Sequence, residues 1–106
     1  MAWMFVLAAG LLEIVWAYTM KPSQGFTRPA PTAATILVML ASFALLSLSM
    51  KTLPLGTAYT VWTGIGAVGA FVVGVVMPGE PLTIGRVLAA ALIVAGLSVM
   101  KLTAPA

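Results

Sequence analysis

Hydrophobic residues run along this chain in four long stretches, which short polar segments separate. The stretches cover residues 2–20, 32–50, 55–77 and 84–103. A bilayer core about 30 Å thick is crossed by about 20 helical residues. The pattern therefore predicts an all-α membrane protein, with one domain over residues 1–106 that contains four transmembrane helices.

The connections between the stretches are short and rich in glycine and proline, which stop one helix and allow the next to begin. They read KPSQGFTRPAP at 21–31, KTLP at 51–54 and PGEPLTIGR at 78–86. Short connections favour antiparallel packing, so we expect successive helices to be neighbours. The fourth stretch is the weakest, but Arg86 and Lys101 near its ends can extend their charged groups to the membrane surfaces.

The amino-acid composition argues against several classes of function. Of the 106 residues, 62% are hydrophobic and 7% are charged, whereas soluble domains carry about 25% charged residues. Without cysteine or histidine, disulfides and thiolate or imidazole metal sites are excluded, and two carboxylates alone make a poor metal site. We expect no cofactor and no metal. The five basic residues form no cluster, so a nucleic-acid partner has no support.

Positive charge is almost balanced between the two sides of the membrane. With four spans, the first and third connections share one side, and the second connection shares the other side with both termini. The first side holds Lys21, Arg28 and Arg86; the other holds Lys51, Lys101 and the N-terminal amine. An excess of Lys and Arg normally fixes orientation, so we hypothesise that the chain inserts both ways round. The alternative is a weak bias that helix hydrophobicity overrides.

Glu13 interrupts the first apolar stretch, within GLLEIVWAYTMK. An acidic side chain near the bilayer centre costs about 2.5–3.5 kcal/mol on insertion scales for Asp. We interpret Glu13 as a carboxyl group that exchanges protons and binds a cation. The alternative is a neutral carboxyl that hydrogen-bonds a neighbouring helix. Gly10, Trp16 and Ala17 share its helix face by spacing, which supplies one donor and room around the acid.

Aromatic and hydroxyl side chains recur in the second and third stretches. Spacings of three and four place Tyr59, Trp62, Thr63 and Gly66 on one stripe. The triplet from Gly64 to Gly66 permits close packing or a bend. In the second stretch Ser42 places a hydroxyl deep in apolar sequence, where a bond to its own helix backbone is the simpler interpretation.

Together these features describe a pocket for an organic cation, with a carboxylate for charge and rings for cation–π attraction. Four helices of this length enclose little volume. A homodimer would give a larger cavity with two copies of Glu13. If the copies insert oppositely, the dimer acquires the inverted two-fold arrangement that many transporters build within one chain.

These residues resemble the small multidrug resistance family along nearly the entire chain. GLLEIVWAYTMKPSQGFTRPAPT is similar to the first helix and loop of that family, and LPLGTAYTVWTGIGAVGA is similar to its third-helix signature. The family contains quaternary-ammonium exporters and guanidinium exporters. Trp16 with Ala17, Trp62-Thr63-Gly64 and Gly79-Glu80 resemble the guanidinium branch.

The resemblance implies an antiparallel, dual-topology homodimer in the bacterial inner membrane that exports guanidinium in exchange for protons. Glu13 would bind both competitively, with Ser42 and Trp16 hydrogen-bonded to its carboxylate. The remaining roles implied are pocket walls at Gly10, Tyr59, Trp62 and Thr63, a flexible segment at Gly64 and Gly66, and dimer packing at Ala89 and Gly96. Tyr18 and Pro22 depart from the residues usual near the family's substrate portal.

Three other functions stay open at this stage: a drug exporter for bulky quaternary ammonium ions, a passive guanidinium channel, and a proteolipid of a proton ring. Four spans with the acid on the first argue against the proteolipid. Glu80, in the third connection, is expected to be a solvated loop charge that pairs with Arg86 rather than a second transport site.

Overall fold

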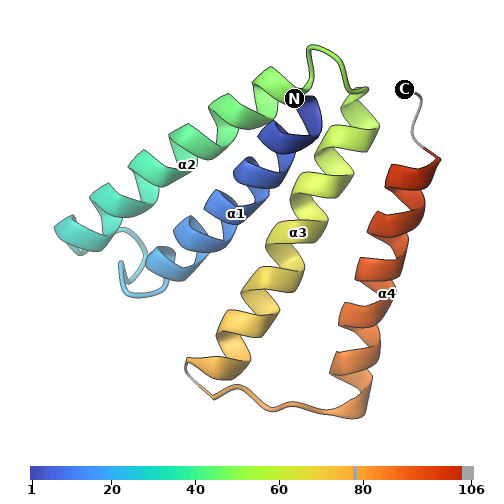
Figure 1. Ribbon diagram of the computed structural model, residues 1–106. Coiled ribbons are helices and arrows are strands. Elements are labelled where there is room, and N and C mark those ends of the chain that lie inside the picture. Colours follow the sequence, from blue (N-terminus) through green and yellow to red (C-terminus); the bar gives the residue numbers. More distant parts are fainter. Residues whose placement is uncertain (78, 104–106) are drawn as a thin grey trace.

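The computed structural model describes residues 1–77 and 79–103, so Pro78 of the third connection lies outside the described residues. This part of the chain forms four helices, α1 (Ala2–Met20), α2 (Pro29–Ser49), α3 (Leu55–Val76) and α4 (Ile84–Leu102) (Figure 1). Each is long and apolar enough to cross a membrane. The prediction of an all-α chain with four apolar helices is confirmed.

The second helix begins at Pro29, earlier than the predicted start at residue 32. Proline is tolerated in a first helical turn, because the N–H that it lacks would have no partner there. The backbone N–H of Thr32 donates to the carbonyl of Arg28 at 3.1 Å, which closes that first turn. At the start of α4, the side chain of Thr83 accepts a hydrogen bond from the backbone N–H of Arg86 at 3.2 Å and caps the helix.

The helices lie side by side in the order α2, α1, α3, α4 (Figure 1). The described residues measure 42 × 35 × 16 Å, and the smallest extent is not much greater than the diameter of one helix with its side chains, about 10–12 Å. The chain is therefore a single layer. The expectation that all successive helices are neighbours is wrong for α2 and α3, which touch only slightly because α1 lies between them.

The buried core is small and lies where α1 meets α2 and α3. Its members are Val6, Ala9, Leu46, Leu53, Ala58, Val61 and Trp62. Helix α4 packs mainly on α3 and contains no buried residue. It reaches α1 where Nζ of Lys101 lies 4.7 Å from the centre of the Trp3 ring. One layer thus leaves two broad faces uncovered by this chain.

Glycine lets α3 approach both of its neighbours closely. A Cβ atom on Gly10 of α1 would lie 2.7 Å from Cγ2 of Ile65, and one on Gly64 would lie 2.6 Å from Cδ2 of Leu97 in α4. A Cβ on Gly69 would overlap the side chain of Ile14. The α1–α3 crossing is therefore tightest around Glu13, since Gly10, Ile14 and Glu13 itself all meet α3 there.

Candidate functional site

Glu13 lies in the middle of α1, with its carboxylate pressed against the backbone of α3 at Gly66. A Cβ atom on Gly66 would overlap the Glu13 carboxylate oxygen Oε1. Glycine at this position is therefore what makes room for the acid. Within residues 1–77 and 79–103, Oε1 is buried and accepts no hydrogen bond, so it is available for a proton or for a donor on a bound molecule.

Trp16 is one helical turn from Glu13, and its indole Nε1 is also buried without a hydrogen-bond partner among the described residues. The implied hydrogen bonds from Ser42 and Trp16 to the Glu13 carboxylate are therefore not formed in this structure. An unpaired acceptor and an unpaired donor close together on α1 are unusual, because buried polar groups are nearly always paired.

Ser42 makes a different set of contacts, which ties three helices together. Its hydroxyl donates to the backbone carbonyl of Ala9 in α1 at 2.7 Å and accepts from the indole Nε1 of Trp62 in α3 at 3.0 Å. The simpler interpretation of Ser42, a bond within its own helix, is also wrong. Ser42 is fully buried, and its hydroxyl bonds to α1 and α3 rather than to the Glu13 carboxylate.

Four aromatic rings form a row across α1, α2 and α3. The ring centroids of Trp16 and Phe43 are 6.4 Å apart, those of Phe43 and Trp62 are 5.8 Å apart, and those of Trp62 and Tyr59 are 5.5 Å apart. Each pair meets edge to face, the arrangement that aromatic quadrupoles favour. The row supplies a π surface beside the acid.

Phe43 joins the two tryptophans of this row, yet sequence reasoning missed it. In the sequence it is the one aromatic residue of the second apolar stretch, and it directly follows Ser42. These two features are the signal that could have drawn attention to it. Whether the Phe43 ring meets Trp16 depends on how α2 packs on α1, and the pattern of residues does not contain that rotation.

The predicted stripe of Tyr59, Trp62, Thr63 and Gly66 divides between two faces of α3. Trp62 and Gly66 are buried towards α1 and α2, whereas Tyr59 and Thr63 are exposed. Tyr59 and Thr63 line a groove of about 550 Å³ between α3 and α4. Successive residues are turned by about 100° around a helix, so Thr63 cannot share the direction of Trp62. Within this chain Thr63 faces the α3–α4 groove, and its place in the pocket with Glu13 stays a prediction.

The two glycines predicted to be a flexible segment lie inside α3, which runs unbroken from Leu55 to Val76. Gly64 accommodates Leu97, and Gly66 accommodates Glu13. In this structure both positions serve close approach of side chains from neighbouring helices. The predicted dimer positions Ala89 and Gly96 are exposed on α4, and a Cβ on Gly96 would meet nothing within 4 Å.

A cavity of about 580 Å³ opens between the second halves of α1 and α3. Ile14, Ala17 and Tyr18 line it from α1, and Val73 and Gly74 line it from α3. Pro22, Lys21 and Glu80 also border it, near the membrane surface. The structure thus brings together Tyr18 and Pro22, the two residues that depart from the usual portal. Ala17 lies one turn from Glu13, so the inner end of the cavity is close to the acid.

Comparisons with known proteins agree on one family. Residues 1–103 match the profile of the family described as Small Multidrug Resistance protein. A protein of Salmonella typhimurium named "Guanidinium exporter" is 53% identical over 104 residues, covering 98% of this chain and 99% of the relative. Proteins with the same name are 52% identical over 103 residues in Citrobacter freundii and 50% identical over 102 residues in Yersinia pseudotuberculosis.

Proposed function

We propose, starting from the fact that this chain belongs to the small multidrug resistance family, that it exports guanidinium ions across the membrane. Its relatives are named as exporters, so the protein is a transporter and not an enzyme. The observation that carries the proposal is the Glu13 carboxylate oxygen Oε1, which is buried and has no hydrogen-bond partner among the described residues, beside a row of aromatic rings. The similarity to guanidinium exporters over almost the whole chain supports the choice of substrate.

Guanidinium fits this chemistry. The ion is planar and can donate two parallel hydrogen bonds to one carboxylate, and its faces stack on aromatic rings. Glu13 supplies the carboxylate, and Trp16, Phe43 and Trp62 supply the rings. The indole N–H of Trp16 is available as a further donor to the carboxylate, which would hold it in one orientation while the cation occupies its other side.

Transport follows if protons and guanidinium compete for Glu13. In this mechanism the protein changes between inward-facing and outward-facing states only when Glu13 carries either a proton or guanidinium. Guanidinium therefore crosses in one direction only when protons cross in the other. Each elementary charge that crosses the membrane is worth about 2.3 kcal/mol per 100 mV. Returning more than one proton per cation would therefore move guanidinium outward against a gradient.

The complete transporter in this proposal is an antiparallel homodimer in the bacterial inner membrane. A single layer of helices leaves two faces uncovered, and α4 has no buried residue. The first and third connections lie at one end of the layer, and the start of α1 and the end of α4 lie at the other (Figure 1). With nearly equal positive charge at the two ends, opposite insertion of two copies pairs their Glu13 residues around one cavity.

A second candidate is export of quaternary ammonium ions. The aromatic row favours it, because a quaternary ammonium ion has no N–H and depends on ring surfaces. The adjacent residues Trp16 and Ala17, which resemble the guanidinium branch, and the names of the relatives favour guanidinium instead. A passive channel for guanidinium is the third candidate, and it differs by requiring no proton movement.

One liposome experiment separates the three candidates. Pure protein is reconstituted with a pH-sensitive dye inside the vesicles and the membrane potential clamped, and guanidinium is added outside. We expect guanidinium to enter and protons to leave, so the internal pH rises, with a smaller response to an aromatic quaternary ammonium ion. Guanidinium entry without a pH change would identify a channel, and a larger response to the quaternary ion would identify a drug exporter.

A further inference from the structure

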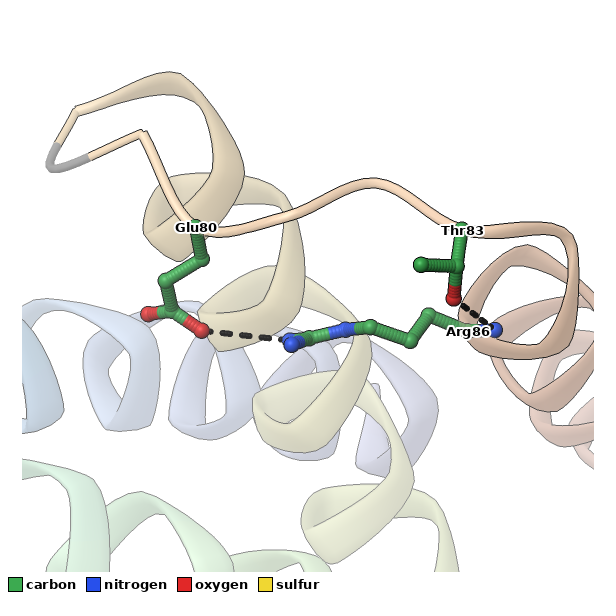
Figure 2. Close-up of polar contacts among 3 residues, drawn as sticks. All are labelled: Glu80, Thr83 and Arg86. Carbon is green, nitrogen blue, oxygen red and sulfur yellow. Dashed lines mark hydrogen bonds and ion pairs between the residues drawn. The ribbon is translucent and has the colours of Figure 1, made fainter.

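Arg86 presents a guanidinium group to a carboxylate and an aromatic ring at the edge of the layer. Its Nη2 atom donates to Oε1 of Glu80 at 3.1 Å, and its Cζ atom lies 5.2 Å from the centre of the Phe71 ring. Figure 2 shows the Arg86 side chain reaching from the first turn of α4 back to Glu80, across the end of α3. The pairing with Glu80 was predicted from the sequence, whereas the contribution of Phe71 was not.

The carboxylate of Glu80 is positioned by contacts that do not involve Arg86. The backbone N–H of Glu80 donates to the carbonyl of Gly74 at 3.1 Å. A Cβ atom on Gly74 would lie 2.9 Å from Cδ of Glu80, so glycine makes room for the acid here, as Gly66 does for Glu13. Phe71 projects from α3 itself. The backbone of Glu80 and the ring are therefore held independently of the guanidinium of Arg86.

Glu80 borders the same 580 Å³ cavity whose inner end reaches Ile14 and Ala17, within a turn of Glu13. Lys21 borders this cavity as well, and its positive charge opposes the entry of a cation. The carboxylate of Glu80 is therefore the group on the described part of the cavity wall that can attract one. A cation that approaches Glu13 from this end of the layer passes Glu80 first.

We propose that Glu80 and Phe71 form a second guanidinium-binding site at the mouth of this cavity, which the side chain of Arg86 occupies until a free guanidinium ion displaces it. The choice of guanidinium as the ligand rests on the transport function proposed above and on the guanidinium group of Arg86 that already lies beside Glu80. Arg86 and Glu80 keep 39% and 44% of their side-chain surface exposed, and exposed ion pairs are weak. The tethered group can therefore exchange with a free one.

The test uses binding rather than transport, in a background where the central site is disabled. Guanidinium chloride, well below denaturing concentrations, is titrated into the full-length Glu13→Gln protein by calorimetry, with sodium chloride as the control for ionic strength. We expect Glu13→Gln/Arg86→Gln to bind guanidinium about threefold more tightly than Glu13→Gln alone, because the weak internal competitor is gone, a change of about 0.7 kcal/mol. Adding Glu80→Gln should abolish that binding.

Helical circular dichroism and elution volume show whether the variants are folded, and Glu13→Gln/Arg86→Met replaces Arg86→Gln if that variant misfolds. Equal affinity with and without Arg86 would overturn the proposal, as would binding that survives Glu80→Gln. Failure here leaves the transport proposal intact, since that depends on Glu13 in wild-type protein. Failure of the liposome experiment would in turn leave this binding measurement unaffected.

Discussion

At the scale of single residues, room for a carboxylate is the feature on which the site depends. Gly66 is the position where α3 passes over Glu13, and the acid has no space there unless the opposing residue lacks a side chain. Ser42 then fixes the surroundings, because it holds Ala9 of α1 and Trp62 of α3 at once. The geometry around Glu13 thus follows from the contacts of Gly66 and Ser42, which the pattern of apolar and polar residues does not reveal.

Replacement of Gly66 by Ala is expected to abolish most guanidinium exchange. The added methyl group overlaps the Glu13 carboxylate and must push the acid or α3 away, so substrate affinity should fall roughly tenfold or more, which corresponds to about 1.4 kcal/mol. Binding is measured by calorimetry on purified protein. Gly56→Ala is the matched control in the same helix, because a Cβ there meets nothing within 4 Å. Unchanged affinity in Gly66→Ala would show that the acid does not need this space.

Replacement of Ser42 by Ala should lower stability by about 1–3 kcal/mol, because it leaves the buried indole N–H of Trp62 without an acceptor. Thermal unfolding in detergent measures the loss. Ser98→Ala is the control, since Ser98 is exposed and bonds only to the carbonyl of Val94 in its own helix, and such surface changes cost within about 0.5 kcal/mol. Equal losses in the two variants would contradict the linking role of Ser42.

At the scale of helices, α3 is the element that joins the two parts of the layer. It packs on α1 through Gly10, Gly66 and Gly69, and it meets α4 where Leu97 lies over Gly64. Apart from Lys101, whose Nζ lies over the Trp3 ring of α1, α4 meets the other described helices only through α3, so this contact and the Glu80–Arg86 pair largely determine where α4 lies. The packing of α4 on α3 should therefore be sensitive to side-chain volume where Leu97 meets Gly64.

A double-mutant cycle at Gly64 and Leu97 tests this attachment. Gly64→Ala brings a methyl group to 2.6 Å from Leu97, and overpacking of this kind typically costs about 1–3 kcal/mol. Leu97→Ala alone removes packing, but on the Gly64→Ala background it should restore stability. We expect a coupling of at least about 0.5 kcal/mol in thermal unfolding. Strictly additive effects would mean that the two residues do not meet.

At the scale of the whole molecule, a layer 16 Å thick cannot surround its substrate. Opposite insertion of two copies would solve this, and it predicts that a C-terminal reporter is found on both sides of the membrane. One added lysine in the first connection should move nearly all copies to a single orientation, because the present charges are balanced. Detection of the wild-type C-terminus on one side alone would contradict dual insertion.

Hydropathy was sufficient to predict the four helices, because a chain in lipid must satisfy its backbone hydrogen bonds within each span. The lateral order was not predictable, since α1 separates α2 from α3 by glycine-mediated packing that apolar runs do not encode. For the same reason the partners of Ser42 and the contacts of Phe43 appear only in the structure. Glu13 and Trp16 could be identified from the sequence, because a polar group in an apolar helix is conspicuous.

Competition between protons and guanidinium for Glu13 can be measured directly as proton release on binding. Guanidinium chloride is added to purified wild-type protein in weakly buffered detergent solution at several pH values, and released protons are counted with a pH indicator. We expect proton release on binding and an apparent affinity that falls as the pH is lowered, because a protonated carboxyl cannot hold the cation. Glu13→Gln should release none. Binding without proton release, or equal release from Glu13→Gln, would show that protons and guanidinium do not compete for Glu13.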